Sequence, residues 1–223
     1  INAVKIFNEK EVDEIMILDI DASVNGVEPN YSLIEKLALE CRMPLCYGGG
    51  INSVEQASKI IELGVEKVAL SSAIIKNTSL ISSIVKTIGS QSVVAVIDVK
   101  KKLFGGYTVF TNNGKKKIDQ DLVKILNQIE DSGAGEIVIN SIDNDGVMKG
   151  YDLTLIKKVR EAVSIPITAL GGAGSKEHIF ELVNRFKIIG AAAGSLFVFK
   201  GIYKAVLINY FTQDEINKLD QNL

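Results

Sequence analysis

Apolar and polar positions follow two alternating periods along the 223-residue chain. Short runs rich in Ile and Val, such as EIMILDI and QSVVAVIDV, alternate with segments such as VEQASKIIELG, in which apolar residues recur every three to four positions. The runs predict buried parallel strands, and the segments between them predict amphipathic helices. This order favours a parallel sheet covered by helices. The strands that we expect span residues 14–19, 44–47, 67–71, 92–98, 136–141, 166–170 and 188–193.

Residues 104–117, FGGYTVFTNNGKKK, interrupt this order after the fourth strand. Their alternation of apolar and polar residues, with a turn at Asn112-Asn113-Gly114, predicts an inserted β-hairpin. Before the first of the strands, residues 1–8 follow the helical period.

The second half of the chain repeats the first at a shift of 122 residues, so that MPLCYGGGINSVE aligns with IPITALGGAGSKE without a gap. Identical pairs include Glu14 with Glu136 and Gly50 with Gly172. Two homologous halves of about four strand–helix units each predict an α/β fold, a (β/α)8 TIM barrel with a two-fold half-barrel repeat, as one domain over residues 1–223. The same shift places the partner of the strand at Asp98 upstream of Ile1. We therefore expect that a first strand, within about 30 residues, is missing from the given sequence.

Charge and cysteine content exclude several classes of function. Lys and Arg number 25 against 27 Asp and Glu without a basic block, which disfavours nucleic acid and anionic membranes as partners. No apolar run approaches the ~20 residues of a membrane span. Cys41 and Cys46 lack CxxC spacing, which fits a reducing, cytoplasmic location. The single histidine, His178, excludes a multi-histidine metal site. We expect neither a metal nor a cofactor, His178 at the solvated surface, and acid–base chemistry by carboxylates.

Candidate binding residues follow the predicted strands, at the barrel end where (β/α)8 enzymes carry their active sites. The turns GGGI and GGAG offer backbone N–H groups beside a helix N-terminus, a geometry that binds phosphate, although tight turns also use glycine for steric reasons alone. Each turn is followed one strand later by a pair of small residues. Two such sites imply a substrate with two phosphates. The candidates are Gly49, Gly50, Ser71, Ser72, Asp145, Gly146, Gly171, Gly172, Gly194 and Ser195.

Candidate catalytic chemistry falls to Asp98, which ends the apolar run VVAVID. A half-buried carboxylate at the mouth of a barrel can act as a general acid or base, and the alternatives are a salt bridge to Lys100 or Lys101 or an ordinary turn residue at the end of the strand. Asp145 with Gly146 is expected to shape a loop or bind a substrate hydroxyl. At the opposite end, three charged residues begin strands, and their chemistry alone favours a structural layer of ion pairs. These residues are Glu14, Lys67 and Glu136.

The motifs ILDIDAS, YGGGI, EKVALSSA, GSQSVVAVIDVK, GAGEIVINSIDNDGVMKGYD and ALGGAGS together resemble the cyclase subunit of imidazole glycerol phosphate synthase over essentially the whole chain. The resemblance implies a two-fold barrel that forms a heterodimer with a glutaminase subunit. It implies that ammonia from this partner reacts with a bis-phosphorylated ribonucleotide in histidine biosynthesis. Asp98 then matches one of two catalytic aspartates, the other lying on the missing strand. Glu14, Lys67 and Glu136 match a gate through which ammonia enters the barrel.

Some positions depart from this family. Ser71-Ser72 stands where Asn-Thr is common, and Asp21 where Thr is usual. These departures resemble a paralogous branch that delivers ammonia for acetamidino groups on surface-polysaccharide sugars. A related sugar-phosphate isomerase and a non-catalytic subunit that only activates the glutaminase are further alternatives, and the hairpin and the gate charges argue against the isomerase.

Overall fold

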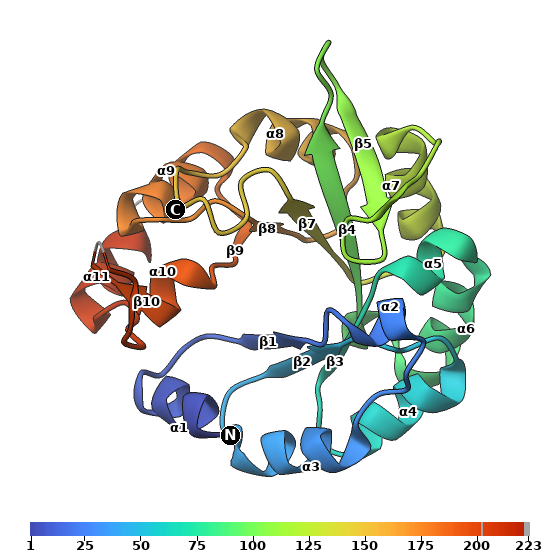
Figure 1. The fold of residues 1–223 in the computed structure, drawn as a ribbon, viewed down its shortest axis with the longest axis horizontal. Helices are drawn as coiled ribbons and strands as arrows, with labels where there is room; N and C mark the ends of the chain where they lie inside the picture. The colour runs from blue at the N-terminus through green and yellow to red at the C-terminus, as the bar shows by residue number, and fades with distance from the viewer. Residues whose placement is uncertain (202, 221–223) are drawn as a thin grey trace.

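A computed structural model, which describes residues 1–201 and 203–220, contains a curled sheet of parallel strands. The strands lie around a central space, with helices outside them (Figure 1). This is the arrangement of a (β/α)8 barrel, so the predicted fold class is confirmed. The parallel strands, in spatial order, are β1 (Ile15–Leu18), β2 (Leu45–Gly48), β3 (Lys67–Leu70), β4 (Val93–Lys101), β7 (Glu136–Ser141), β8 (Ile167–Leu170) and β9 (Gly190–Ala191).

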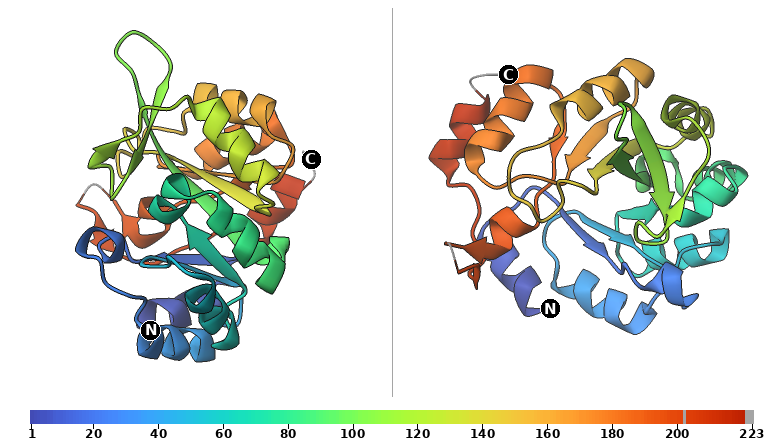
Figure 2. Two further views of the ribbon diagram at one scale, coloured as in Figure 1. Left: turned by 90° about the vertical axis from the view of Figure 1, so that its right-hand side faces the viewer. Right: turned by 45° about the horizontal axis from the view of Figure 1, so that its top comes forward.

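Helices alternate with these strands along the chain and cover the outside of the sheet (Figure 2). Two short strands, β10 (Phe199–Lys200) and β11 (Ala205–Val206), form a separate hairpin near the C-terminus. The helices are α1 (Asn2–Glu9), α2 (Ala22–Asn25), α3 (Tyr31–Glu40), α4 (Val54–Glu62), α5 (Ser72–Lys76), α6 (Ser79–Ile88), the 3-10 turn η1 (Ser90–Ser92), α7 (Leu122–Asp131), α8 (Leu153–Ala162), α9 (Lys176–Phe186), α10 (Ser195–Val198) and α11 (Gln213–Asp220).

The sequence repeat is also a structural repeat. Helix α3 and strand β2 have the same lengths as α8 and β8, and their bounds differ by the shift of the sequence alignment. Even the helix caps correspond, because the side chain of Asn30 accepts a hydrogen bond from the N–H of Leu33 and that of Asp152 from the N–H of Leu155. Such side-chain oxygens satisfy an N–H group that the first helical turn leaves free.

Two apolar layers result from the alternation of side chains along the strands. The outer layer, between sheet and helices, holds large aliphatic side chains such as Ile60, Ile84 and Leu126, which are fully buried. The inner cluster, inside the barrel, is built from smaller residues. Its members are Cys46, Ala69, Val94, Val96 and Val138.

The inserted hairpin differs from the sequence prediction in its construction. Strand β4 does not end at Asp98 but continues to Lys101 and pairs antiparallel with β5 (Tyr107–Thr111). The turn between β4 and β5 contains Gly105 and Gly106, both with positive φ. The strand continues because the alternation of buried and exposed residues extends past Asp98. The predicted turn at Asn112 exists, but it joins β5 to the two-residue strand β6 (Lys116–Lys117).

The last predicted strand, residues 188–193, is also too long. Lys187 has a φ of 60° and Ile188 is 82% exposed, so the chain joins the sheet only at Gly190. Strands β1 and β9 stand at the two ends of the strand order. The missing first strand and the single domain over the whole chain stay predictions.

None of the helices in the described part of the chain has the length and apolar character that a membrane crossing requires.

Candidate active site

The larger of two neighbouring cavities lies at the C-terminal ends of the strands and has a volume of about 220 Å³. Its lining comes mainly from the ends of β1 to β4 and the loops after them, together with Asn140, Asp145 and Leu170 of the other half, and it includes six of the predicted site residues. We call it the first cavity. The six predicted residues are Gly49, Gly50, Ser71, Ser72, Asp98 and Asp145.

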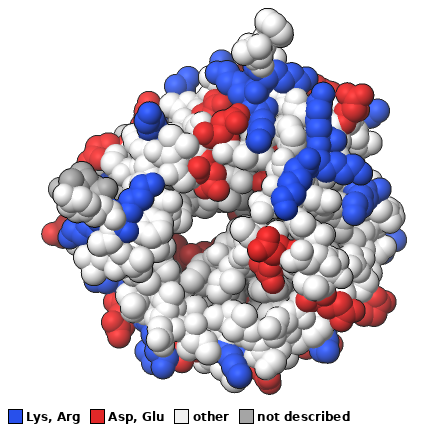
Figure 3. Space-filling model, in the orientation of Figure 1, with Lys and Arg blue, Asp and Glu red and all other residues white. Residues whose placement is uncertain are grey.

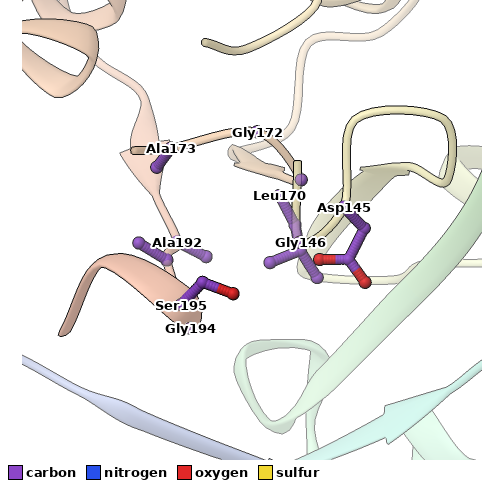
Figure 4. Close-up of a pocket in the computed structure, with 10 residues that line it drawn as sticks. Asp145, Gly146, Leu170, Gly172, Ala173, Ala192, Gly194 and Ser195 are labelled. Carbon is purple, nitrogen blue, oxygen red and sulfur yellow. The ribbon is translucent and has the colours of Figure 1, made fainter. Parts of the chain in front are cut away.

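The second cavity is lined by the corresponding loops of the other half-barrel. Asp145 is common to the two cavities, so they adjoin. In Figure 4 the hydroxyl of Ser195, at the start of α10, points toward the side on which Asp145 and Gly146 lie. The predicted residues in its lining are Asp145, Gly146, Gly171, Gly172, Gly194 and Ser195. The structure thus brings all ten predicted binding residues to the two cavities.

The glycines of the two turns have a steric reason within the fold. Gly50 and Gly172 have φ values of 72° and 114°. A Cβ on them would lie 2.6 Å from the carbonyl oxygen of Val27 and 2.1 Å from that of Gly150, respectively. Gly194 is different, because its φ is −100° and a Cβ there would meet no atom within 4 Å. The fold therefore gives no steric reason for a glycine at this position.

Asp98 points into the first cavity from β4, directly opposite Asn140 on β7. The amide Nδ2 of Asn140 donates a hydrogen bond of 2.8 Å to Oδ1 of Asp98. Burial raises the pKa of the Asp98 carboxyl, the Asn140 hydrogen bond lowers it, and the negative charge of Asp145 raises it, with a net increase. Over the residues that the structure describes, Asp98 forms no ion pair with Lys100 or Lys101.

Asn140 was not among the residues singled out from the sequence. Its Oδ1 is buried and accepts no hydrogen bond within the described structure. The alternation of side chains along β7 could have indicated it, because this alternation places Asn140 on the inward face of the strand, opposite Asp98. That position opposite Asp98 depends on the register between two strands, which the sequence does not show.

The hydroxyl of Ser72 connects the first cavity to the inserted hairpin. Ser72 is 8% exposed, and its Oγ accepts a hydrogen bond of 2.9 Å from the backbone N–H of Asn112. Asn113, the next residue of the same turn, lines the first cavity. The turn between β5 and β6 is therefore part of the site.

The prediction that His178 lies at the solvated surface is wrong. The residue is half-buried, and its Nδ1 accepts a hydrogen bond of 3.1 Å from the N–H of Gly174. The sequence places His178 on α9 but does not show that the preceding loop folds back over its ring.

At the opposite end of the barrel, Lys67 bridges the two glutamates. Its Nζ lies 2.7 Å from Oε2 of Glu14 and 3.0 Å from Oε2 of Glu136. Thr168 also donates a hydrogen bond of 2.6 Å to Oε1 of Glu136. Burial works to lower the pKa of Lys67, but the hydrogen bonds to both glutamates outweigh it and raise the pKa. We call Glu14, Lys67 and Glu136 the floor cluster.

Charge is unevenly distributed on the face that Figures 1 and 3 present. Lys and Arg side chains gather on the side where Figure 1 places β4 and β5, whereas Asp and Glu side chains lie beside the central opening (Figure 3). Within the described residues, no group of three or more His, Cys, Asp or Glu is arranged to hold a metal ion.

Comparison with known proteins identifies the family of this barrel. A family model described as histidine biosynthesis protein matches residues 1–204. The chain belongs to this family. A protein of Vibrio vulnificus, named provisionally as imidazole glycerol phosphate synthase subunit hisF3, is 58% identical over 98% of this chain and 84% of its own length.

Two further relatives extend the comparison of histidine biosynthesis proteins. A Pseudomonas aeruginosa protein, provisionally the hisF2 subunit of the same synthase, is 50% identical over 99% of this chain and 86% of its own length. The imidazole glycerol phosphate synthase subunit HisF of Chlorobium limicola is 40% identical over 88% of this chain and 78% of its own length. The names carry no support that is specific to the acetamidino-sugar branch.

Proposed function

We propose that this protein is the cyclase subunit of imidazole glycerol phosphate synthase, an enzyme of histidine biosynthesis that receives ammonia from a glutaminase partner. The observation that carries the proposal is the position of Asp98 in a cavity between two glycine turns of a histidine biosynthesis family barrel. The substrate is a bis-phosphorylated ribonucleotide, and the products are imidazole glycerol phosphate and an aminoimidazole carboxamide ribotide. We place the reaction in the cytoplasm.

The two glycine turns, one beside each cavity, suit the two ends of such a substrate. One phosphate binds at Gly49 and Gly50 with Ser71-Ser72, and the other at Gly171 and Gly172 with Gly194-Ser195. Backbone N–H groups at glycine turns beside helix N-termini favour dianions. Gly194 supports this assignment, because the fold itself leaves room for a side chain there. Asp145 and Gly146, which line the second cavity beside the first, then contact the middle of the substrate.

Asp98 acts as the general acid or base between the two phosphates. Its raised pKa brings proton exchange nearer to neutral pH than an exposed aspartate allows. The hydrogen bond from Asn140 holds one carboxylate oxygen, which leaves the other oxygen of Asp98 to exchange a proton with substrate.

Ammonia enters at the floor cluster. The small side chains of the inner apolar cluster lie between this end and the first cavity, and among them Cys46 is close enough to feel the charges of Glu14, Glu136 and Lys67. Small apolar side chains leave room for a neutral molecule such as ammonia, whereas a charged species would lose its hydration there at a high cost in free energy. The glutaminase docks at this end of the barrel.

The test is turnover with ammonium salt as the nitrogen donor. Asp98→Asn should keep the fold and the affinity for substrate and lose roughly 10² to 10⁴ in turnover, the range of a general acid or base. Asp121→Asn is the matched control, because Asp121 caps α7, outside both cavities, and asparagine caps helices equally well. Near-wild-type turnover in Asp98→Asn would contradict the catalytic role.

The same assay separates the alternatives. A wild-type protein that forms no imidazole glycerol phosphate contradicts the cyclase assignment. If its complex with the glutaminase still delivers ammonia from glutamine to a sugar acceptor, the acetamidino-sugar branch replaces it. If the protein only accelerates glutamine hydrolysis by the partner, it is the non-catalytic subunit that activates the glutaminase.

A further inference from the structure

Two side chains hold the two glycine turns in the same way, although they are different residues. Gln56, on the first turn of α4, accepts a hydrogen bond at Oε1 from the N–H of Asn52, with a distance of 2.8 Å. His178, on the first turn of α9, accepts one at Nδ1 from the N–H of Gly174. Gln56 and His178 are equivalent under the sequence repeat, and so are Asn52 and Gly174. An amide oxygen and an imidazole nitrogen thus occupy the same position in the two half-barrels.

Both hydrogen bonds satisfy N–H groups that lie in the turns, ahead of the helices. The N–H groups that they satisfy precede the helix caps Ser53 and Ser175. In the first half, Ser53 already accepts a hydrogen bond from the N–H of Gln56, so α4 has a cap of its own. The side chain of Gln56 therefore fixes the path of the chain before the helix begins.

His178 holds a second loop as well. Gly150 lies beside its ring, since a Cβ built on this glycine would be 3.6 Å from Cδ2 of His178. The N–H of Gly150 donates a hydrogen bond of 2.7 Å to the carbonyl oxygen of Gly172, and the amide of Asn144 donates one of 3.0 Å to the carbonyl oxygen of Gly150. The loop after β7 and the loop after β8 both line the second cavity. His178 thus lies beside both loops that form that cavity without lining it.

We propose that Gln56 and His178 are positioning residues, each of which sets the shape of one phosphate-binding turn, and that His178 also locks the second turn to the loop that carries Asp145 and Gly146. The inference rests on the proposed function only in that the two turns bind phosphate. A flexible glycine turn must lose its conformational freedom when it binds an anion. A side chain that orders the turn beforehand reduces this loss and tightens binding.

The test is a titration with inorganic phosphate, followed by amide NMR signals of both turns in one sample. In His178→Ala, phosphate should bind roughly three- to tenfold more weakly at Gly172 and Gly174, the effect of about one hydrogen bond. Binding at Gly49 and Gly50 should be unchanged, which makes the first turn an internal control. Gln56→Ala should give the mirror result. His178→Gln, which copies the acceptor of the other half-barrel, should bind within about twofold of the wild type.

Three outcomes decide between the possibilities. Wild-type affinity at both turns in His178→Ala, with a lower Tm, reduces His178 to a helix cap and overturns the inference alone. An unresponsive pair of turns in the wild-type protein overturns the two-phosphate site of the proposed function, and this inference with it. If His178→Ala does not fold, His178→Leu fills the volume of the ring without an acceptor, and it should show the same loss at the second turn only.

Discussion

At the scale of the residue, burial and the negative charge of Asp145 both raise the pKa of the Asp98 carboxyl, and the hydrogen bond from Asn140 opposes them. This carboxyl keeps one hydrogen bond, from Asn140, and faces the negative charge of Asp145. Burial is the largest effect and raises the pKa. The group that we propose as the catalytic acid or base is therefore one whose ionised form is unfavourable in the folded protein.

Asp98→Asn should consequently stabilise the protein at neutral pH. Because the folded state holds the proton more tightly than the unfolded state, the free energy of unfolding of the wild type falls as pH rises from the ordinary aspartate pKa through the raised one. Asparagine has no such dependence and keeps the oxygen that Asn140 binds. The Tm of the variant should exceed that of the wild type at pH 7 to 8, and the difference should shrink toward pH 4. A variant that is less stable at pH 7 would show that the buried charge is compensated.

Gly194→Ala adds one methyl group that should affect substrate binding but not the stability of the fold. The backbone conformation suits any residue and the new Cβ meets no atom, so the free energy of unfolding should change by less than about 0.5 kcal/mol. If phosphate occupies the second cavity, the KM for substrate should rise roughly tenfold, which corresponds to about 1.4 kcal/mol. Gly172→Ala is the contrasting variant, because its methyl would collide with Gly150 and should lower the Tm. An unchanged KM in Gly194→Ala would place the phosphate elsewhere.

The sequence predicted the residues of the site whose position follows from strand ends and the repeat. Asp98 and the glycine turns are of this kind, since the end of a strand fixes which face of the barrel they reach. Asn140 and Thr168 could not be found this way, because their roles depend on the register with neighbouring strands. His178 was misjudged because its contact is made by a loop that has no regular period.

At the scale of the element, the hairpin of β4 and β5 with the short β6 is an insertion that participates in the site. Its turn at Asn112 and Asn113 has two residues with positive φ and donates one hydrogen bond to Ser72. Residues 104–117 were predicted as a hairpin from their alternation, and this is confirmed in outline. The antiparallel partner of β5 turned out to be β4 itself, because nothing in the apolar run marks where a parallel strand leaves the barrel.

Ser72→Ala should loosen this hairpin from the barrel. The N–H of Asn112 loses its acceptor, which should cost about 1 kcal/mol and speed hydrogen exchange in the amides of β5 and its turn. Ser71→Ala is the matched control, because Ser71 lines the same cavity and its hydroxyl forms no hydrogen bond to the hairpin. Equal exchange rates in both variants would show that packing alone holds the hairpin.

Most strands were predicted within one or two residues because their apolar runs are short and bounded by polar residues and glycine. The exception at the C-terminal side is β9, where Ile188 reads as the start of a strand but is exposed. Apolar character marks burial in most strands, and a single isoleucine beside a turn at Lys187 carries no such information.

At the scale of the whole molecule, the two ends of the barrel are chemically distinct. One end has the glycine turns and Asp98, and the other has the floor cluster. The repeat explains why Glu14 and Glu136 occupy equivalent positions, and Lys67 lies between them. From chemistry alone this cluster is an ion-pair layer, and the structure contains those ion pairs. A gate and a structural layer share this geometry, so only a functional measurement distinguishes them.

Lys67→Met distinguishes the two roles. Removing the lysine leaves two glutamates without their cation, and both roles predict a lower Tm. Only a gate predicts that the ratio of glutamine-dependent to ammonium-dependent rates changes in the complex with the glutaminase, since only the first route crosses the floor. Lys157→Met, which removes an exposed pair with Glu161, should change neither quantity appreciably. An unchanged ratio in Lys67→Met, with the complex intact, would return the floor cluster to a structural role.

The two thiols of the chain differ in burial and therefore in reactivity. Cys46 is completely buried on β2, and burial raises the pKa of its thiol far above the ordinary value. Cys41 is only half-buried, at the end of α3. Burial raises the pKa of the Cys41 thiol as well, but Cys41 is partly exposed, so thiol reagents reach it in the folded protein, whereas they reach Cys46 only when neighbouring strands separate. The rate at which the second thiol is lost to the reagent therefore measures how often the parallel sheet opens.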